Sequence, residues 1–232
     1  MGDQPSWNDL ARDLLHLINT FSSQLPLPIV GMGHSYGGHA VIRASLLHPS
    51  LFLTLIAIDP VIELSEACSG KTPAMASVRR VDIWPDRETA EKYFRNRKFY
   101  KTWDPRCLDA HMKHGLRELP NAAYPDGKGW TLATTKHQEV FTFMKCEGES
   151  GQERCVVHEA CGDTWKMLPE VRPKVLYIVG KESPVCTEIA NKGKMEYTRS
   201  AEMAEISGVG HLVPLEKPTE TGELDGTLTS DA

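Results

Sequence analysis

Three residues of this chain have types that together could cleave an acyl group from its carrier: Ser35, Asp59 and His211. A serine hydroxyl is a weak nucleophile, and it needs a general base that is itself oriented by an acid. Each of the three follows a short apolar run, and the carboxyl ends of parallel strands collect at one edge of a sheet. The sequence therefore predicts a nucleophilic serine, with Asp59 and His211 as its acid and base.

The serine lies in the pentapeptide GHSYG at 33–37, between an apolar pair at 29–30 and an apolar helical pattern that continues to Leu47. Strand, sharp turn and helix in this order are typical of a nucleophile elbow. Gly33 and Gly37 leave no side chain where the strand and helix backbones approach each other. The alternative is a glycine-rich turn that contains a serine by chance. A phosphate-binding loop fits poorly, because its Lys-Ser/Thr ending is missing.

The acid has two candidates. Asp59 follows the apolar run LFLTLIAI at 51–58, and Pro60 prevents a central strand from continuing. Glu182 follows a second strand-like run, KVLYIVG at 174–180, and it adjoins Ser183, which follows the same run but is not an acid. We favour Asp59 because it ends a clean, buried strand.

The base is predicted to be His211, at the apex of the glycine-rich loop GVGHLVP at 208–214. Eight other histidines compete for this role. His34 and His39 are close to Ser35 in sequence, but one lies inside the elbow and the other on the following helix. We expect both of these side chains to point into packing.

Composition limits the classes of partner. The 232 residues are 41% hydrophobic and 25% charged, with a net charge of -5, so nucleic acid is not an expected partner. Apolar runs fall far short of the ~20 residues that span a bilayer, so no membrane span is predicted. The first residues lack an apolar signal region, which favours an intracellular protein.

Residues 61–169 are charged and rich in aromatic residues, and we interpret them as a mainly helical cap. Within this segment, 79–106 holds nine Lys or Arg residues against five acids. We favour an amphipathic cap helix with a solvated basic face. The alternative is an electropositive rim that attracts an anionic substrate, such as one carrying the phosphates of coenzyme A.

Four residues have a spacing that invites comparison with a zinc site: Cys146, Cys155, His158 and Cys161. Their spacing is not one of the usual paired-ligand patterns, and cysteine is often a small buried hydrophobe. We predict no metal and no cofactor. The six scattered cysteines do not indicate a disulfide framework either.

Four phrases carry a resemblance to a known family: GHSYGG at 33–38, AIDPV at 57–61, WDPR at 103–106 and GVGHLVPLEKP at 208–218. In these the chain resembles the α/β-hydrolase superfamily, and most closely the fungal toxin-biosynthesis hydrolases of secondary metabolism, which include acyl-CoA hydrolases. The resemblance implies hydrolysis of an acyl ester or acyl-CoA thioester through an acyl-serine. Ser35 would be the nucleophile, His211 the base and then the acid, and Asp59 its orienter, while Tyr36 would donate one oxyanion-hole amide.

The resemblance also bears on compartment. Some peroxisomal members of the group end in a Ser-Lys-Leu-type signal, whereas this chain ends Ser-Asp-Ala. We therefore expect a cytoplasmic protein, or a peroxisomal one by family resemblance alone.

The predicted fold class is α/β: a partial α/β-hydrolase fold whose mainly parallel sheet carries a helical cap after the strand that follows the elbow. Residues 1–60 would form core with the elbow, 61–169 the cap, 170–218 core with the histidine loop, and 219–232 a disordered, acidic tail.

Only 27 residues precede the serine strand, so we expect a chain truncated at its N-terminus. Missing strands would leave an open sheet edge that favours homo-oligomerisation. The alternative function is accordingly a catalytically inactive, hydrolase-like protein that binds a partner.

Overall fold

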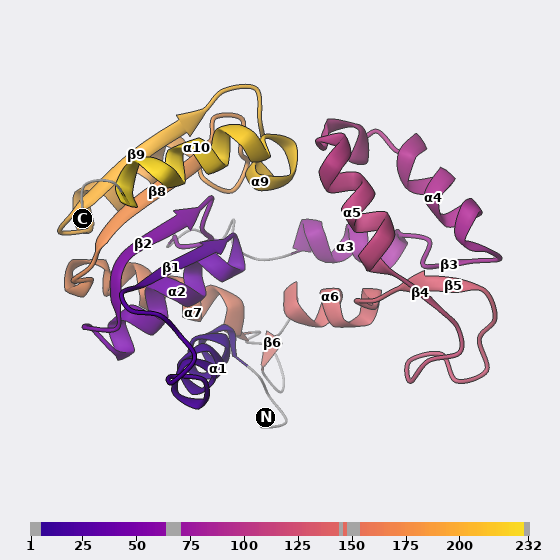
Figure 1. The fold of residues 1–232 in the computed structure, drawn as a ribbon, viewed down its shortest axis with the longest axis horizontal. Coiled ribbons are helices and arrows are strands. Elements are labelled where there is room, and N and C mark those ends of the chain that lie inside the picture. Colours follow the sequence, from indigo (N-terminus) through magenta and orange to yellow (C-terminus); the bar gives the residue numbers. More distant parts are fainter. Residues whose placement is uncertain (1–5, 64–70, 144–145, 148–153, 230–232) are drawn as a thin grey trace. The chain divides into compact units, whose positions relative to one another are not determined.

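The computed structural model describes residues 6–63, 71–143, 146–147 and 154–229. Within these ranges the chain divides into two compact units (Figure 1). The core unit comprises residues 1–69, 146–214 and 219–232, and the cap unit comprises 70–145 and 215–218. The cap therefore begins after the second strand of the core.

The core unit is built on a four-stranded parallel sheet with the strand order β1-β2-β8-β9. Its strands are β1 (Ile29–His34), β2 (Phe52–Ile58), β8 (Lys174–Gly180) and β9 (Ala201–Ile206). Because all four run in the same direction, their carboxyl ends lie at one edge, where His34 pairs with Ile58 and Ile58 with Ile178. This is the edge at which active sites of parallel α/β sheets form.

Helices cover both faces of this sheet (Figure 1). The helices of the core unit are α1 (Trp7–Thr20), α2 (Tyr36–Leu47), α7 (Val156–Lys166), α8 (Glu188–Tyr197) and α10 (Pro218–Thr229). On β2, Leu55 and Ala57 pack in the cluster that includes α1 and α2, whereas Ile56 and Ile58 pack in the opposite cluster, which α10 joins through Leu224. The alternation follows from the two-residue period of a strand and explains the continuous apolar run.

The cap unit has its own aromatic core. Its helices are α3 (Lys71–Arg79), α4 (Arg87–Asn96), α5 (Pro105–Gly115) and α6 (Lys136–Phe143), and a short antiparallel sheet has the order β3 (Ile83–Trp84), β5 (Trp130–Leu132), β4 (Leu116–Glu118). Trp84, Phe94 and Tyr100 are buried there. The sequence analysis expected no such strands; two or three residues are too short to show an alternating pattern.

Several basic residues of the segment 79–106 form ion pairs. Their acidic partners also lie in the cap unit. Arg87 pairs with Glu91, Arg95 with Asp109, and Arg80 with Glu139 at 2.9 Å. These pairs neutralise much of the local positive charge. They favour the solvated amphipathic interpretation over an electropositive rim.

The division into units differs from the expected boundaries. Residues 61–169 were assigned to the cap, but of the described residues in this range, 61–63, 146–147 and 154–169 belong to the core unit. The reason lies in packing, because Ala160 and Cys161 of α7 are buried against Trp7 of α1. These contacts join segments about 150 residues apart in sequence, and the local charge pattern carries no sign of them.

The tail also differs from expectation. Residues 219–232 were predicted to be disordered, whereas Pro218–Thr229 form helix α10. Proline suits the first position of a helix because its fixed φ is already helical. Thr221 is buried, and Leu224 packs on the sheet.

In the described ranges, no helix is both long and apolar enough to cross a bilayer.

Gly180, at the end of β8, provides a test of the close packing at the sheet edge. A Cβ at this position would lie 2.1 Å from the carbonyl oxygen of Gly210. We predict that Gly180→Ala lowers the unfolding free energy by about 3 kcal/mol, because two backbones must separate. For a chain of this length the melting temperature falls by roughly 6–12 °C, measurable by thermal denaturation.

The matched control is Gly222→Ala on α10, where an added Cβ meets nothing within 4 Å. This variant should be neutral or more stable by up to about 1 kcal/mol, as expected for alanine in a helix. Equal melting temperatures for Gly180→Ala and the wild type would contradict the close approach.

His39, on α2 and fully buried, predicts a pH dependence of stability. Its Nε2 lies 3.1 Å from the carbonyl oxygen of Ala160, and burial lowers the pKa of His39 from 6.5 to about 4. At pH values between 4 and 6.5, His39 is therefore protonated in the unfolded chain but not in the folded chain. The unfolding free energy should therefore fall by about 3 kcal/mol as the pH drops from 6.5 to 4.

Urea titrations at several pH values would measure this effect. His39→Gln should remove this part of the pH dependence, whereas His48→Gln, at the exposed end of the same helix, serves as the control. If wild type and His39→Gln lose stability in parallel below pH 6.5, the assignment to His39 is wrong.

Candidate active site

Ser35 occupies the turn between β1 and α2, in a backbone conformation that serine rarely adopts. Its φ is 55° and its ψ is -118°. The turn is held by hydrogen bonds on both sides: the Ser35 N–H donates to the carbonyl of Ile58 at 2.8 Å, and its carbonyl accepts from His39 at 3.2 Å. Strain of this kind is typical of functional positions and lifts the side chain away from the sheet.

The glycines around the serine explain why the turn can be this tight. A Cβ on Gly33 would lie 2.2 Å from the carbonyl oxygen of Gly37, and one on Gly38 would lie 2.8 Å from Pro60. At Gly37 an added Cβ meets nothing within 4 Å. The sequence analysis was therefore right about Gly33 but wrong about Gly37, since Gly38 makes the second close approach.

His211 lies between the other two candidates. Its Nε2 is 2.8 Å from the Ser35 Oγ, and its Nδ1 is 2.6 Å from the Asp59 Oδ2. A carboxylate only accepts hydrogen bonds, so the proton belongs on Nδ1 and leaves Nε2 to accept the serine proton. Residues 35, 59 and 211, predicted from separate parts of the sequence, thus form one hydrogen-bonded chain.

Asp59 follows β2 directly and is fully buried. Its Oδ1 accepts the backbone N–H of Gly180 at 3.0 Å, and its Oδ2 accepts the hydroxyl of Ser183 at 2.6 Å as well as His211. Its φ is 42°, and within the described ranges Ser35 and Asp59 are the two non-glycine residues with positive φ. The strained backbone positions therefore coincide with two of the three candidate residues.

Glu182, the alternative acid, has a different place. Its Oε2 accepts the backbone N–H of Val209 at 2.7 Å, and its own N–H donates to the Val209 carbonyl at 3.1 Å. Glu182 thus holds the start of the loop that carries His211, while the carboxylate on the imidazole is that of Asp59.

The two histidines near Ser35 in sequence both form hydrogen bonds with distant segments of the core unit. The Nε2–H of His34 donates to the carbonyl of His211 at 2.7 Å, and burial lowers the pKa of His34. His39 is buried on α2, with its Nε2 2.9 Å from the Thr164 hydroxyl. His34 therefore fixes the backbone of His211, a role that the sequence analysis did not anticipate.

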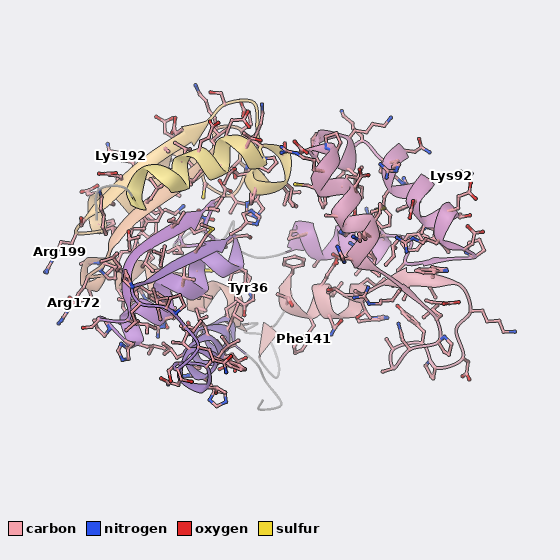
Figure 2. All side chains as sticks on the ribbon, in the orientation of Figure 1. Tyr36, Lys92, Phe141, Arg172, Lys192 and Arg199 are labelled. Atoms are coloured by element: carbon pink, nitrogen blue, oxygen red, sulfur yellow. The ribbon has the colours of Figure 1, made fainter. Side chains whose placement is uncertain are left out.

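Tyr36 begins α2, so its backbone N–H has no acceptor within the helix. Its side chain packs on Trp7, with ring centroids 4.3 Å apart, and burial raises the pKa of Tyr36 to about 12. Figure 2 shows Tyr36 at the opposite end of the core unit from Arg172 and Arg199, which precede β8 and β9. The elbow thus lies at the carboxyl ends of the strands.

The cysteine and histidine group considered for zinc is described only in part. The side chains of Cys146, Cys155 and His158 lie outside the described part of the structure, and Cys161 is buried in the core unit. Among the side chains that are described, no cluster of three or more His, Cys, Asp or Glu residues has the arrangement of a metal site.

Sequence reasoning missed two groups at the site, the Gly180 amide and the Ser183 hydroxyl. Both contact Asp59, from which they are separated by more than 120 residues. Ser183 entered the sequence analysis only as a place where an acid was absent. The one available signal was that it follows the same strand end as Glu182.

Known proteins support a hydrolase assignment. The chain is 31% identical over 265 aligned residues to a type I acyl-CoA thioesterase of Penicillium roqueforti, covering 91% of this chain and 60% of the relative. A second type I acyl-CoA thioesterase, from Penicillium brevicompactum, is 47% identical over 126 residues, 52% of this chain and 29% of the relative. The chain thus spans less than two thirds of the length of these relatives. An abhydrolase domain-containing protein of Alternaria alternata, AFT2-1, is 29% identical over 85% of this chain and 81% of its own length.

Solved structures show the same fold. The peroxisomal alpha-beta-hydrolase Lpx1 of Saccharomyces cerevisiae superimposes with a TM-score of 0.78 at 20% identity, covering 98% of this chain and 60% of Lpx1. E-2-(Acetamidomethylene)succinate hydrolase gives a TM-score of 0.73 at 21% identity, covering 99% of this chain and 77% of that structure. The sequence also matches the profile of the Alpha/beta hydrolase family over residues 1–224. The chain belongs to the alpha/beta hydrolase family.

Proposed function

We propose that this protein is a serine hydrolase that cleaves an acyl ester or an acyl thioester through an acyl-serine intermediate. The observation that carries the proposal is the continuous hydrogen-bonded chain from the Ser35 Oγ through His211 to Asp59, with contacts of 2.8 and 2.6 Å. A base that contacts the nucleophile, and is itself oriented by a carboxylate, is the arrangement that activates a serine.

In the acylation step, the Ser35 Oγ attacks the carbonyl carbon of the substrate while the His211 Nε2 takes the hydroxyl proton. The carbonyl oxygen becomes an oxyanion, and the backbone N–H of Tyr36 donates to it. The tetrahedral intermediate then collapses, the bond to the leaving group breaks, and His211 returns the proton to the leaving oxygen or sulfur. Asp59 stabilises the positive imidazole formed between these two proton transfers.

In the deacylation step, water repeats the attack on the acyl-serine. His211 takes a proton from the water, and the new tetrahedral intermediate collapses to release the carboxylic acid. The proton returns to the Ser35 Oγ, which restores the starting state. No metal or redox cofactor takes part in either step.

For the leaving group we propose a thiol such as coenzyme A, with an alcohol as the alternative. The support comes from the relatives in Penicillium, which are named acyl-CoA thioesterases. A thiolate is also the better leaving group, because thiols are much more acidic than alcohols. The resemblance to fungal toxin-biosynthesis hydrolases supports a step in secondary metabolism as its setting.

We predict that a fluorophosphonate probe labels the wild-type chain at Ser35, because such probes report a serine that a base has activated. Ser35→Ala should not be labelled, and His211→Ala should react about 10³-fold more slowly. Gel fluorescence over time gives the rate, and mass spectrometry identifies the modified residue.

The matched control is Ser45→Ala on α2, which removes a buried hydroxyl that bonds only its own helix, at the Ile42 carbonyl. It should be labelled at the wild-type rate. If the folded wild-type chain does not react, the proposal is wrong and the alternative of an inactive binding protein takes its place.

A second prediction separates the two candidate acids. Asp59→Asn should lower kcat by about 10⁴-fold for both an acyl-CoA thioester and a p-nitrophenyl ester, because the amide no longer holds the imidazole in the required tautomer. Glu182→Gln keeps an oxygen for the Val209 N–H and should remain within about 2-fold of wild type. The reverse ranking of the two variants would identify Glu182 as the acid.

A further inference from the structure

The carboxylate of Asp59 has a contact that the mechanism above does not use. Its Oδ2 lies 2.6 Å from the Ser183 Oγ and also 2.6 Å from the His211 Nδ1. The oxygen that orients the base is thus shared between an imidazole N–H and a serine hydroxyl. Ser183 lies in the turn directly after β8 and is buried.

The direction of the Ser183 hydrogen bond is fixed by its other partners. A serine hydroxyl has one proton to donate and two lone pairs that accept. The backbone N–H groups of Val185 and Cys186 each donate to the Ser183 Oγ at 3.2 Å. Both lone pairs are therefore occupied, and the proton can only point toward the Asp59 Oδ2.

The turn that carries Ser183 is itself anchored. The Ser183 N–H donates to the Gly180 carbonyl at 3.0 Å, and the side-chain amide of Asn191 donates to the Cys186 carbonyl at 3.0 Å. The Cys186 thiol donates to the Pro60 carbonyl at 3.5 Å. Ser183 is thus held from β8, from α8 and from the residue that follows Asp59.

Lys194 also contacts the turn that carries Ser183, through Cys186. Its side chain is 1% exposed, and its Nζ lies 3.1 Å from the Cys186 Sγ. Burial raises the pKa of Cys186 to about 12, so the thiol keeps its proton for the Pro60 carbonyl. The result is a rigid hydroxyl aimed at one oxygen of a buried carboxylate.

We propose that Ser183 is a positioning residue for catalysis: its hydroxyl fixes the rotation of the Asp59 carboxylate so that Oδ2 faces the His211 Nδ1. This inference rests on the proposed serine hydrolase mechanism. The Gly180 N–H fixes Oδ1 in the same way, so each carboxylate oxygen has one donor besides the base. A serine that served only to cap its turn would need the two accepted N–H bonds but not the donated one.

The test is Ser183→Ala, compared with Ser183→Thr, which keeps the hydroxyl. We expect Ser183→Ala to lower kcat for a p-nitrophenyl ester by about 10-fold with an unchanged KM, because the carboxylate loses one charge-assisted bond while the residue does not touch substrate. Ser183→Thr should recover most of the loss. The control is Thr198→Val, which removes the buried hydroxyl bonded at 2.9 Å to Tyr177 and should leave kcat unchanged.

A second readout does not depend on turnover. The His211 Nδ1 proton, shared with Asp59, should give a far-downfield proton resonance in the folded wild type. Ser183→Ala should shift or broaden this resonance, and Thr198→Val should not. An unchanged resonance together with an unchanged kcat in Ser183→Ala overturns the proposal. If the wild type shows the resonance but has no activity, the hydrolase function is contradicted instead. The effect of Ser183→Ala on the resonance then tests, by itself, whether Ser183 positions Asp59.

Discussion

The buried carboxylate of Asp59 is the interaction on which the rest of the core unit depends. Moving an ionised carboxylate out of water costs several kcal/mol unless donors replace the lost hydration. The structure supplies such donors from separate segments: the Gly180 amide at the end of β8, the Ser183 hydroxyl in the next turn, and His211 in the loop after β9. The charge is therefore satisfied only when β2, β8 and that loop are in register.

The same requirement explains where backbone strain is located. Ser35 and Asp59 both have positive φ, at the ends of neighbouring strands. Their N–H groups nevertheless continue the sheet, since Ser35 donates to Ile58 at 2.8 Å and Asp59 donates to Ile178 at 2.7 Å. Each strained residue is thus fixed by a ladder bond to the next strand, and this offsets a conformation that would cost about 1–3 kcal/mol if unsupported. The hydrogen bonds of the parallel sheet thus offset the backbone strain at both Ser35 and Asp59.

Local sequence signals were sufficient for the parts of the site that depend on strand ends. The residues Ser35, Asp59 and His211 each follow a strand or lie in a glycine-rich loop, and the parallel geometry then brings them together. The Ser183 contact and the assignment of 146–169 to the core could not be predicted in this way, because both arise from packing between distant segments. Helix α10 was missed for a related reason: its polar composition does not indicate that Thr221 is buried or that Leu224 packs on the sheet.

The base is less enclosed than the acid that orients it, and its surroundings show how its electrostatics are controlled. The side chain of His211 is 24% exposed, whereas that of Asp59 is fully buried. His34 has its ring centroid 5.0 Å from that of His211 and donates to the His211 carbonyl. Because burial lowers the pKa of His34, this neighbour stays neutral and places no positive charge beside the imidazole. His34 can therefore fix the backbone of the base without opposing the positive charge that the base must carry during the reaction, while the negative charge that supports it comes from Asp59.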